Sequence, residues 1–235
     1  MSKLNLEILA YEEGPLGLLC LRQREVLSQP GTIVTEMTLN HEFLMSSLYT
    51  DSERALAQTA IQMHSGEDLR VLVGGLGLGY TAREALLADC VGHVEVMELQ
   101  PQVIGWLARG LVPLSSELRA EIDGTRRLTI SQGDVFQRLS HPPDGLFDVI
   151  VIDVDHSPEE RLGNQNSSFY TTQGLLAARQ HLTAGGVLAV WSYTESSPFS
   201  DALHKVFEQI HVEPISYDNQ LIDQERTDWL FFARA

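Results

Sequence analysis

Four glycines lie within six residues, directly after a short apolar run. The segment VLVGGLGLGYTARE, residues 71–84, places Gly74, Gly75, Gly77 and Gly79 directly after its apolar residues. Glycine allows backbone dihedrals that other residues avoid, and the helix expected to follow presents unpaired N–H groups at its start. The pattern predicts a bend that holds a ligand. A tight strand-to-helix connection without a ligand would use the same residue types.

Acidic residues follow the next two apolar runs. Glu98 ends VEVME 23 residues after Gly75, which is close to the distance of about 20 residues expected for a carboxylate that holds ribose hydroxyls. A carboxylate can accept hydrogen bonds from both hydroxyls of a vicinal diol. The alternative is an N-cap acid for a helix that begins near Pro101. Gly133 and Asp134 end the following run, where Asp134 could reach an adenine amino group. These positions together indicate an adenosine-bearing ligand.

Two further acids end the run FDVIVIDVD. Asp153 and Asp155 lie there, and Asp155 could accept a proton from an attacking amine or hold its ammonium form. A loop-entry acid in a turn is the alternative for Asp155. His156 is a second candidate base. Trp191 and Tyr193 could enclose a cation with their aromatic faces, although one of the two is expected in the core.

The glycine bend and the acids can form one site only if the strands before them end at the same edge of a sheet. Apolar runs of strand length alternate with helical patterns from residue 69 onward, which is typical of a parallel sheet covered by helices. Because ligands bind at the carboxyl ends of such strands, the glycine bend and the acids are expected to lie together. The expected strands are 69–75, 93–98, 127–132, 147–155 and 186–193, and the expected helices lie around 79–89, 101–112, 168–182 and 199–210.

The first part of the chain has a different pattern. Short mixed segments separated by GP and SQPG turns predict a small antiparallel β-hairpin unit over residues 1–49. A helix follows in TDSERALAQTAIQMH, with Thr50 or Asp51 at its N-cap. We therefore expect an N-terminal unit at 1–49 and a second domain at 50–235.

The composition of the chain argues against several classes of function. The chain has 235 residues and a net charge of −16, so its surface should repel nucleic acid and anionic lipid. The same charge would attract a cationic small molecule; the alternative is that the excess of acids only keeps the protein soluble. It contains neither an apolar stretch of membrane-spanning length nor a secretory signal, which predicts a cytoplasmic protein without membrane contact. Cys20 and Cys90 have no metal-like spacing, so neither a metal site nor a disulfide is expected.

The order of these motifs resembles the spermidine synthase-like branch of the class I S-adenosylmethionine-dependent methyltransferase superfamily. The resemblance covers most of residues 30–235 and rests on the glycine bend with ARE, Glu98, the GD at 133–134, FDVIVID, the FY pair at 169–170 and LTAGGVLAVW. It implies an α/β fold with a Rossmann-like, doubly wound, mostly parallel seven-stranded sheet and a small N-terminal antiparallel β unit. It also implies an adenosyl sulfonium cofactor and a homodimer.

The resemblance also assigns roles to individual residues. Gly75, Gly77, Gly79 and the intervening Leu78 would line the cofactor, Glu98 would bind its ribose, Gly133 and Asp134 would face the adenine, Asp153 would begin the acidic active-site motif together with Asp155, and Tyr170 would border the substrate pocket. Two departures stand out. Leu78 occupies the position of the family's aspartate in G-G-G-D-G-G, and Asp155 comes one residue early relative to D-S-S-D.

These features predict a small-molecule transferase that uses S-adenosylmethionine or its decarboxylated form and acts on an amine-like, cationic acceptor. Since Leu78 removes the expected ammonium partner, ordinary S-adenosylmethionine and methyl transfer are the default, and aminopropyl transfer is the alternative. A second alternative is a protein that binds an adenosyl ligand without catalysis. An NAD-dependent oxidoreductase is disfavoured because Tyr80 stands where the last glycine of the dinucleotide pattern would fall.

Overall fold

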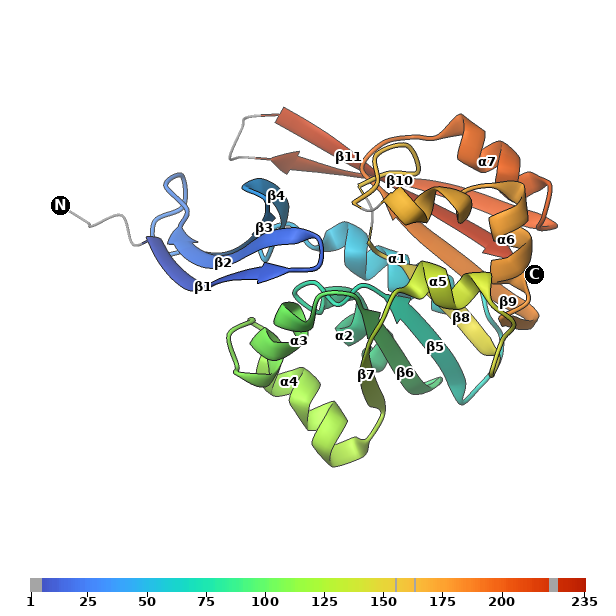
Figure 1. Ribbon diagram of the computed structural model, residues 1–235, viewed down its shortest axis with the longest axis horizontal. Coiled ribbons are helices and arrows are strands. Elements are labelled where there is room, and N and C mark those ends of the chain that lie inside the picture. Colours follow the sequence, from blue (N-terminus) through green and yellow to red (C-terminus); the bar gives the residue numbers. More distant parts are fainter. Residues whose placement is uncertain (1–5, 155, 163, 220–223) are drawn as a thin grey trace.

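Two separate β-sheets form the framework of the protein (Figure 1). The computed structural model describes residues 6–154, 156–162, 164–219 and 224–235. The N-terminal sheet is antiparallel, has four strands in the order β1-β2-β3-β4, and matches the small N-terminal β unit expected from the sequence. Its strands are β1 (Leu6–Gly14), β2 (Gly17–Glu25), β3 (Ile33–Leu39) and β4 (Glu42–Ser46).

The second sheet has seven strands in the order β10-β11-β9-β8-β5-β6-β7. Its strands are β5 (Leu69–Gly74), β6 (Val91–Glu98), β7 (Leu128–Gln132), β8 (Phe147–Ile152), β9 (Leu182–Ser192), β10 (Gln209–Asn219) and β11 (Gln224–Arg234). The neighbouring strands β9, β8, β5, β6 and β7 pair in parallel. The strand β11 pairs antiparallel with both β9 and β10. After β5 the chain adds β6 and β7 on one side of it, and then adds β8 and β9 on the other side. In such a sheet the ligand binds in the crevice where this direction changes, which is between β5 and β8. The predicted fold class is confirmed.

Helices cover both faces of the seven-stranded sheet (Figure 1). They are α1 (Asp51–Gln62), α2 (Tyr80–Leu87), α3 (Pro101–Ala108), α4 (Ser115–Ala120), α5 (Val135–Ser140), α6 (Thr172–Arg179) and α7 (Ser197–His204), with a short π-helix at Glu121–Thr125 and a 3-10 helix at Asn164–Ser168. Buried residues of α1, α2 and α3 pack on one face, and those of α5, α6 and α7 pack on the other. Since both faces are buried, the central strands are apolar throughout.

The C-terminal region differs from the expectation. The helix expected at 199–210 ends at His204, and the chain forms the edge strand β10 from Gln209. This strand alternates between exposed and partly buried residues and contains Pro214, which an edge strand tolerates because it needs fewer backbone donors. The helix expected at 168–182 is also shorter: α6 begins at Thr172, where the Thr171 side chain caps it.

The N-terminal sheet is fastened to the helix α3. Arg109 forms an ion pair with Glu12 at 2.6 Å, and the Trp106 indole N–H donates to the same carboxylate. The Gln102 side chain donates to the Glu13 carbonyl oxygen at 2.6 Å. Buried side chains of β2 and β3 also belong to the same apolar cluster as α3. The N-terminal sheet is therefore held beside the strand ends at which a ligand would bind.

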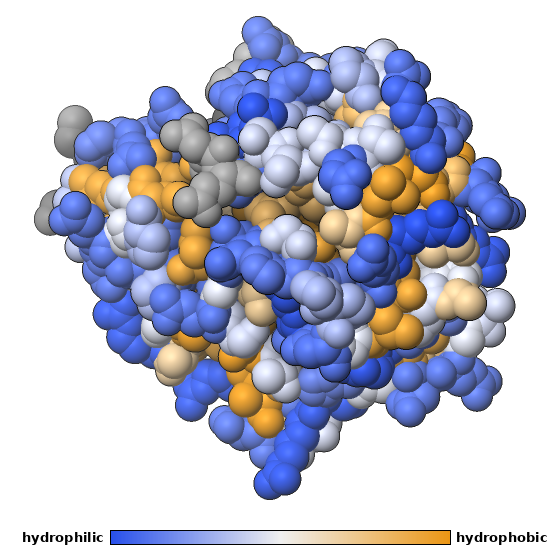
Figure 2. Space-filling view, turned by 45° about the vertical axis from the view of Figure 1, so that its right-hand side comes forward, coloured by the Kyte–Doolittle hydropathy of each residue, from blue (hydrophilic) through white to orange (hydrophobic). Residues whose placement is uncertain are grey.

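The outer surface is mainly polar. Figure 2 shows hydrophilic residues over most of one face, with hydrophobic residues in patches between them. Within the described part of the chain, no helix is both long and apolar enough to cross a membrane.

Candidate functional site

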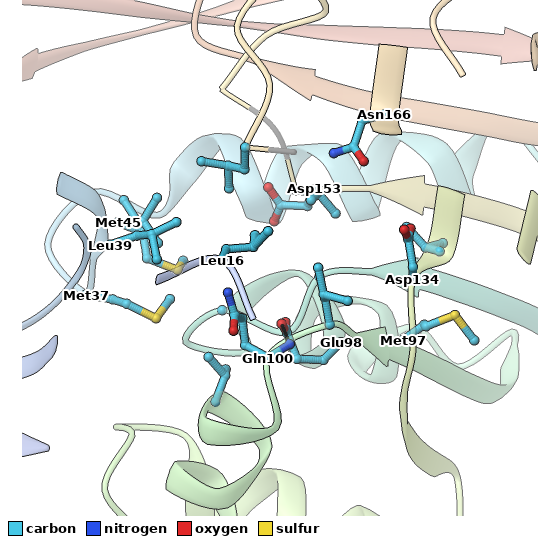
Figure 3. Close-up of a pocket in the computed structure, with 18 of the residues that line it drawn as sticks. Leu16, Met37, Leu39, Met45, Met97, Glu98, Gln100, Asp134, Asp153 and Asn166 are labelled. Carbon is cyan, nitrogen blue, oxygen red and sulfur yellow. Dashed lines mark hydrogen bonds between the residues drawn. The ribbon is translucent and has the colours of Figure 1, made fainter. Parts of the chain in front are cut away.

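A pocket opens between the N-terminal sheet and the carboxyl ends of the parallel strands (Figure 3). Its lining includes the sequence-predicted residues Gly75, Gly77, Glu98, Gly133, Asp134, Asp153, His156 and Trp191. Residues from five segments far apart in sequence thus meet at one site, as expected for the edge of a parallel sheet.

Gly75 begins the bend after β5 and needs to be glycine. Its φ is +91°, and a Cβ atom there would lie 2.3 Å from the carbonyl oxygen of Asp153. The bend therefore passes directly against the end of β8, at the point where the strand order switches. Gly77 also has a positive φ of +50°, but a Cβ atom there would meet only the flexible side chain of Met45.

The backbone N–H groups of this bend are already engaged. Gly75 donates to the Met97 carbonyl oxygen at 2.9 Å, and Gly79 donates to the Leu76 carbonyl oxygen at 2.8 Å. The N–H groups of Leu76 and Gly77 are directed to the Glu98 carboxylate. The N–H of Leu78 lies 3.3 Å from the Met45 sulfur. A ligand anion would therefore have to displace an existing acceptor to bind along Gly75–Gly79.

Glu98 is buried and holds the bend in place. Its two carboxylate oxygens accept the N–H groups of Leu76 and Gln100, each at 2.7 Å. Burial raises the pKa of Glu98, and these backbone N–H groups oppose that rise. The bond to Gln100 at the N-cap of α3 means that the capping alternative also holds in part. Since each carboxylate oxygen has two lone pairs, Glu98 can still accept from ribose hydroxyls.

Asp134 caps the helix α5. Its Oδ1 accepts the backbone N–H groups of Phe136 at 2.9 Å and Gln137 at 3.2 Å. The second oxygen, Oδ2, accepts neither of these bonds. Figure 3 shows Asp134 beside Met97 on one side of the pocket. A carboxylate oxygen next to a soft apolar side chain suits the amino group and ring of an adenine.

Asp153 follows β8 and accepts a hydrogen bond from the Thr81 hydroxyl at 2.6 Å. Burial raises the pKa of Asp153 to about 6; the Thr81 hydroxyl opposes this rise, and the negative charge of Asp228 adds to it. Among the described residues, no Lys or Arg forms an ion pair with Asp153. Its carboxylate thus faces the pocket as an unneutralised negative charge.

Glu53, on α1, lies in the pocket although no sequence motif indicates it. It lines the pocket and is 8% exposed. Burial, and then the charge of Asp153, raises the pKa of Glu53 to about 8. A hydroxyl connects it to the rest of an acidic cluster: Ser52 lies 3.2 Å from Glu53 and 2.6 Å from Asp228, and the Trp191 indole N–H donates to Ser52.

Gln100 is a second pocket residue that no sequence motif indicates. Its side chain is 6% exposed and lines the pocket, yet neither amide atom has a hydrogen-bond partner in the described part of the structure. Figure 3 places it between Leu16 and Glu98. A buried amide without a partner costs free energy, which a ligand could recover by bonding to it.

Four of the described residues that the sequence indicated for the site do not line the pocket: Leu78, Gly79, Tyr170 and Tyr193. Leu78 is completely buried in the core, and Gly79 instead forms the N-cap of α2 with a φ of +93°. Tyr170 packs edge to face on Phe199 and Phe169. Asp155 lies outside the described residues. Tyr193 directly follows β9, and its hydroxyl donates to Glu160 outside the pocket lining.

No family model matches the chain. Among curated proteins, polyamine aminopropyltransferase 2 of Streptomyces coelicolor is 36% identical over 126 residues, which are 53% of this chain and 22% of that protein. The polyamine aminopropyltransferase of Prochlorococcus marinus is 29% identical over 152 residues, covering 65% of this chain and 47% of that protein. The chain thus matches less than half of the length of either relative.

Solved structures extend the comparison over the whole chain. A spermidine synthase in complex with the transition state analogue AdoDATO matches with a TM-score of 0.75 and 20% identity, over 99% of this chain and 74% of that one. The chain has the spermidine synthase fold. Spermidine synthase from Thermotoga maritima agrees, with a TM-score of 0.72 and 18% identity over 97% of this chain and 72% of that one.

In this spermidine synthase-like chain, the charges of the site are distributed unevenly. Glu53, Glu98, Asp134 and Asp153 all line the pocket. The described lining contains no Lys or Arg, and His156 is its one basic side chain. The same residues include no group of three or more His, Cys, Asp and Glu side chains placed to hold a metal. The pocket is therefore suited to a ligand that carries positive charge and an adenosine-like group.

Proposed function

We propose that this chain transfers an aminopropyl group from decarboxylated S-adenosylmethionine to an amine. The carrying observation is the acidic lining of the pocket: Glu53 and Asp153 line it, whereas no Lys or Arg does so among the described residues. Both curated relatives are named polyamine aminopropyltransferases, which supports the same choice. This reverses the order expected from Leu78, since Glu53 supplies a carboxylate that the bend itself lacks.

The two candidate cofactors differ in one carboxylate. A carboxylate that leaves water for a pocket needs a cation or several N–H donors. The N–H groups of Gly75 to Gly79 are engaged, and two carboxylates line the space. Ordinary S-adenosylmethionine would place its carboxylate beside these two acids without a cation to pair with it, whereas the decarboxylated form would bring only positive charge, which favours the ionised form of both acids. The engaged N–H groups and the two carboxylates of the pocket thus fit the decarboxylated compound better.

The protein's part in the reaction is to position the reactants and accept a proton. The bound donor supplies a carbon next to its sulfonium; the amine nitrogen bonds to this carbon while the carbon–sulfur bond breaks and its electrons remain on sulfur, leaving methylthioadenosine. Glu98 and Asp134 would hold the ribose and adenine. Asp153, whose pKa is raised by burial, can take the proton that the new secondary amine must lose. Glu53 would hold an ammonium group beside it.

Calorimetric titration with both cofactors tests the proposal. We expect decarboxylated S-adenosylmethionine to bind at least about tenfold more tightly than S-adenosylmethionine, because only the latter brings an unpaired carboxylate. Methylthioadenosine should appear when an amine is added. Tighter binding of S-adenosylmethionine, with release of S-adenosylhomocysteine, would instead establish methyl transfer. Binding without any turnover would favour the non-catalytic alternative.

The Glu98→Ala variant should lose cofactor affinity. Removing hydrogen bonds to a charged group typically costs about 1.5 to 3 kcal/mol, and this carboxylate would hold the ribose while fastening the bend. Titration with methylthioadenosine measures the loss. Glu95→Ala is the matched control, because Glu95 lies on the same strand but pairs with Arg138 away from the pocket. Unchanged affinity in Glu98→Ala would mean that the ribose is held elsewhere.

The segment 156–168 is expected to act as a lid. Leu162 and Asn166 from this segment line the pocket, and Ser157 caps a turn by accepting the N–H of Glu160 at 2.8 Å. Closure over the reacting carbon would exclude water, so amide hydrogen exchange in 156–168 should slow when cofactor and acceptor are both bound. The α4 segment, away from the pocket, serves as an internal control. Equal exchange with and without ligands would exclude a lid.

A further inference from the structure

The pocket has an acidic side and an uncharged side. Its described acids gather at the strand ends and on α1, where the charge of Asp153 is felt by Glu53. The opposite wall comes from the N-terminal sheet and its β1–β2 turn. Every lining residue from that unit is apolar: Leu16, Leu19, Met37, Leu39, Leu44 and Met45.

The wall lies beyond the expected ribose position. Figure 3 shows Met37, Leu39 and Met45 grouped on the side of the pocket away from Asp134, with Glu98 and Asp153 between them. If adenine lies at Asp134 and ribose at Glu98, the sulfonium end of the donor is directed toward Asp153 and this wall. An acceptor that reaches the sulfonium must therefore lie along the wall.

One neutral polar group interrupts the apolar surface. Gln100 lies next to Leu16, and its amide is buried without a partner among the described residues. An amide can hydrogen-bond to an uncharged group, but it does not neutralise an ammonium ion. A ligand that fills this space is thus expected to be uncharged here, and the unpartnered amide indicates that the space is built for a ligand.

A second ammonium would be poorly placed along this wall. Methylene groups gain free energy on contact with the leucine and methionine side chains, whereas a cation there loses water without an opposite charge in return. Further out, Glu42 is exposed and Glu160 accepts the Tyr193 hydroxyl. Arg161 lies in the same outer part of the pocket as these two acids, and its positive charge offsets part of theirs.

We propose that the acceptor is a primary amine with a single cationic nitrogen and an uncharged, mainly apolar body, rather than a polyamine. The amine end would lie at Glu53 and Asp153, and the body would lie along Leu39, Leu44 and Met45. This inference rests on the proposed function, because it takes the pocket as the meeting place of an adenosyl donor and an amine.

A matched pair of amines tests this inference by binding. Hexylamine and hexamethylenediamine have the same chain and differ in one terminal ammonium. Each is titrated by calorimetry into the protein saturated with methylthioadenosine. We expect hexylamine to bind at least about tenfold more tightly, since the diamine must desolvate a charge at the wall.

A charge placed in the wall should reverse the preference. Leu44 is half-buried on β4, so Leu44→Glu can be accommodated while its carboxylate enters the pocket. This variant should shift the affinity ratio toward hexamethylenediamine by about fivefold, as expected for a partly exposed ion pair. Phe43→Glu is the matched control: Phe43 is the preceding residue on the same strand, is 55% exposed and is absent from the pocket lining, so the ratio should stay unchanged.

The outcomes separate the inference from the proposed function. Tighter or equal binding of the diamine to the wild-type protein overturns the inference, as does binding of neither amine. The inference is also overturned if Leu44→Glu leaves the affinity ratio of the two amines unchanged. This result counts only if the variant is folded, that is, if it unfolds cooperatively at the same temperature as Phe43→Glu. By contrast, hexylamine binding with no release of methylthioadenosine from decarboxylated S-adenosylmethionine counts against aminopropyl transfer alone.

Discussion

The Gly75→Ala variant should lose about 3 to 5 kcal/mol of folding free energy and bind no adenosyl ligand. Two costs combine at this position. A φ of +91° is unfavourable for any residue with a Cβ atom, and that atom would lie 2.3 Å from the backbone oxygen of Asp153. A carbonyl oxygen at a strand end cannot rotate away as a side chain can, so the bend must separate from β8. Chemical denaturation measures the first effect and calorimetry the second.

Gly31→Ala isolates the steric cost. Gly31 has nearly the same φ, +88°, but nothing lies within 4 Å of the position its Cβ atom would take. This variant should lose only about 1 to 2 kcal/mol, from the backbone conformation alone. Gly77→Ala should be intermediate, because Met45 can move. If Gly75→Ala and Gly31→Ala lose the same free energy, the close approach of the bend to Asp153 is not tight.

The Glu53→Gln variant should be more stable than the wild-type protein at alkaline pH. Burial and the neighbouring Asp153 charge raise the pKa of Glu53 to about 8 from its ordinary value of 4.5. The folded protein therefore holds this proton more tightly than the unfolded chain does. The resulting stabilisation is complete below about pH 4.5 and is lost as the pH rises through about 8.

Glutamine remains neutral at every pH, so the variant escapes that loss. We expect its free energy of unfolding to exceed the wild-type value by on the order of 3 kcal/mol near pH 9 and to match it near pH 5. Urea denaturation at the two pH values measures the difference. Asp51→Asn is the control, since Asp51 is an exposed acid on the same helix and does not line the pocket. A gain of equal size at both pH values would show that Glu53 is not protonated in the folded protein at low pH.

The parallel part of the fold could be predicted because its signal is local. Runs such as FDVIVI are apolar on both faces, and only a strand covered on both sides buries all of them. The edge strand β10 gives no such signal, because its pattern is half-exposed and includes Pro214. Its place depends on pairing with β11, which is a long-range contact that periodicity does not report.

A residue's place in the pocket could be predicted where the position of its backbone at a strand end decides that place. Gly75, Glu98, Asp134 and Asp153 follow strand ends, so the sheet brings them together whatever their side chains do. Leu78 shows the limit, because its position in the motif could not reveal that its side chain turns into the core.

Glu53 was missed because an acid in the first turn of a helix is ordinary. One signal could have found it: Glu53 lies three and four residues before the buried Leu56 and Ala57, on the apolar face of α1. Gln100 had no comparable signal, since its burial depends on how the β1–β2 turn is placed over α3. Its Oε1 would lie only 2.3 Å from a Cβ atom at Gly14.

The division of the pocket between two sheets has a consequence for how such proteins diverge. The acids that would bind the donor come from α1 and the seven-stranded sheet, whereas the wall that would contact the acceptor comes from the β1–β2 turn and from β2, β3 and β4. Under the proposed function, substitutions at Leu39 or Leu44 would change the choice of amine without altering the donor contacts, whereas Met45 also contacts the glycine bend. The first 46 residues would then behave as an exchangeable specificity cassette, and chimaeras that trade this segment between related chains should inherit their amine from one parent and their donor from the other.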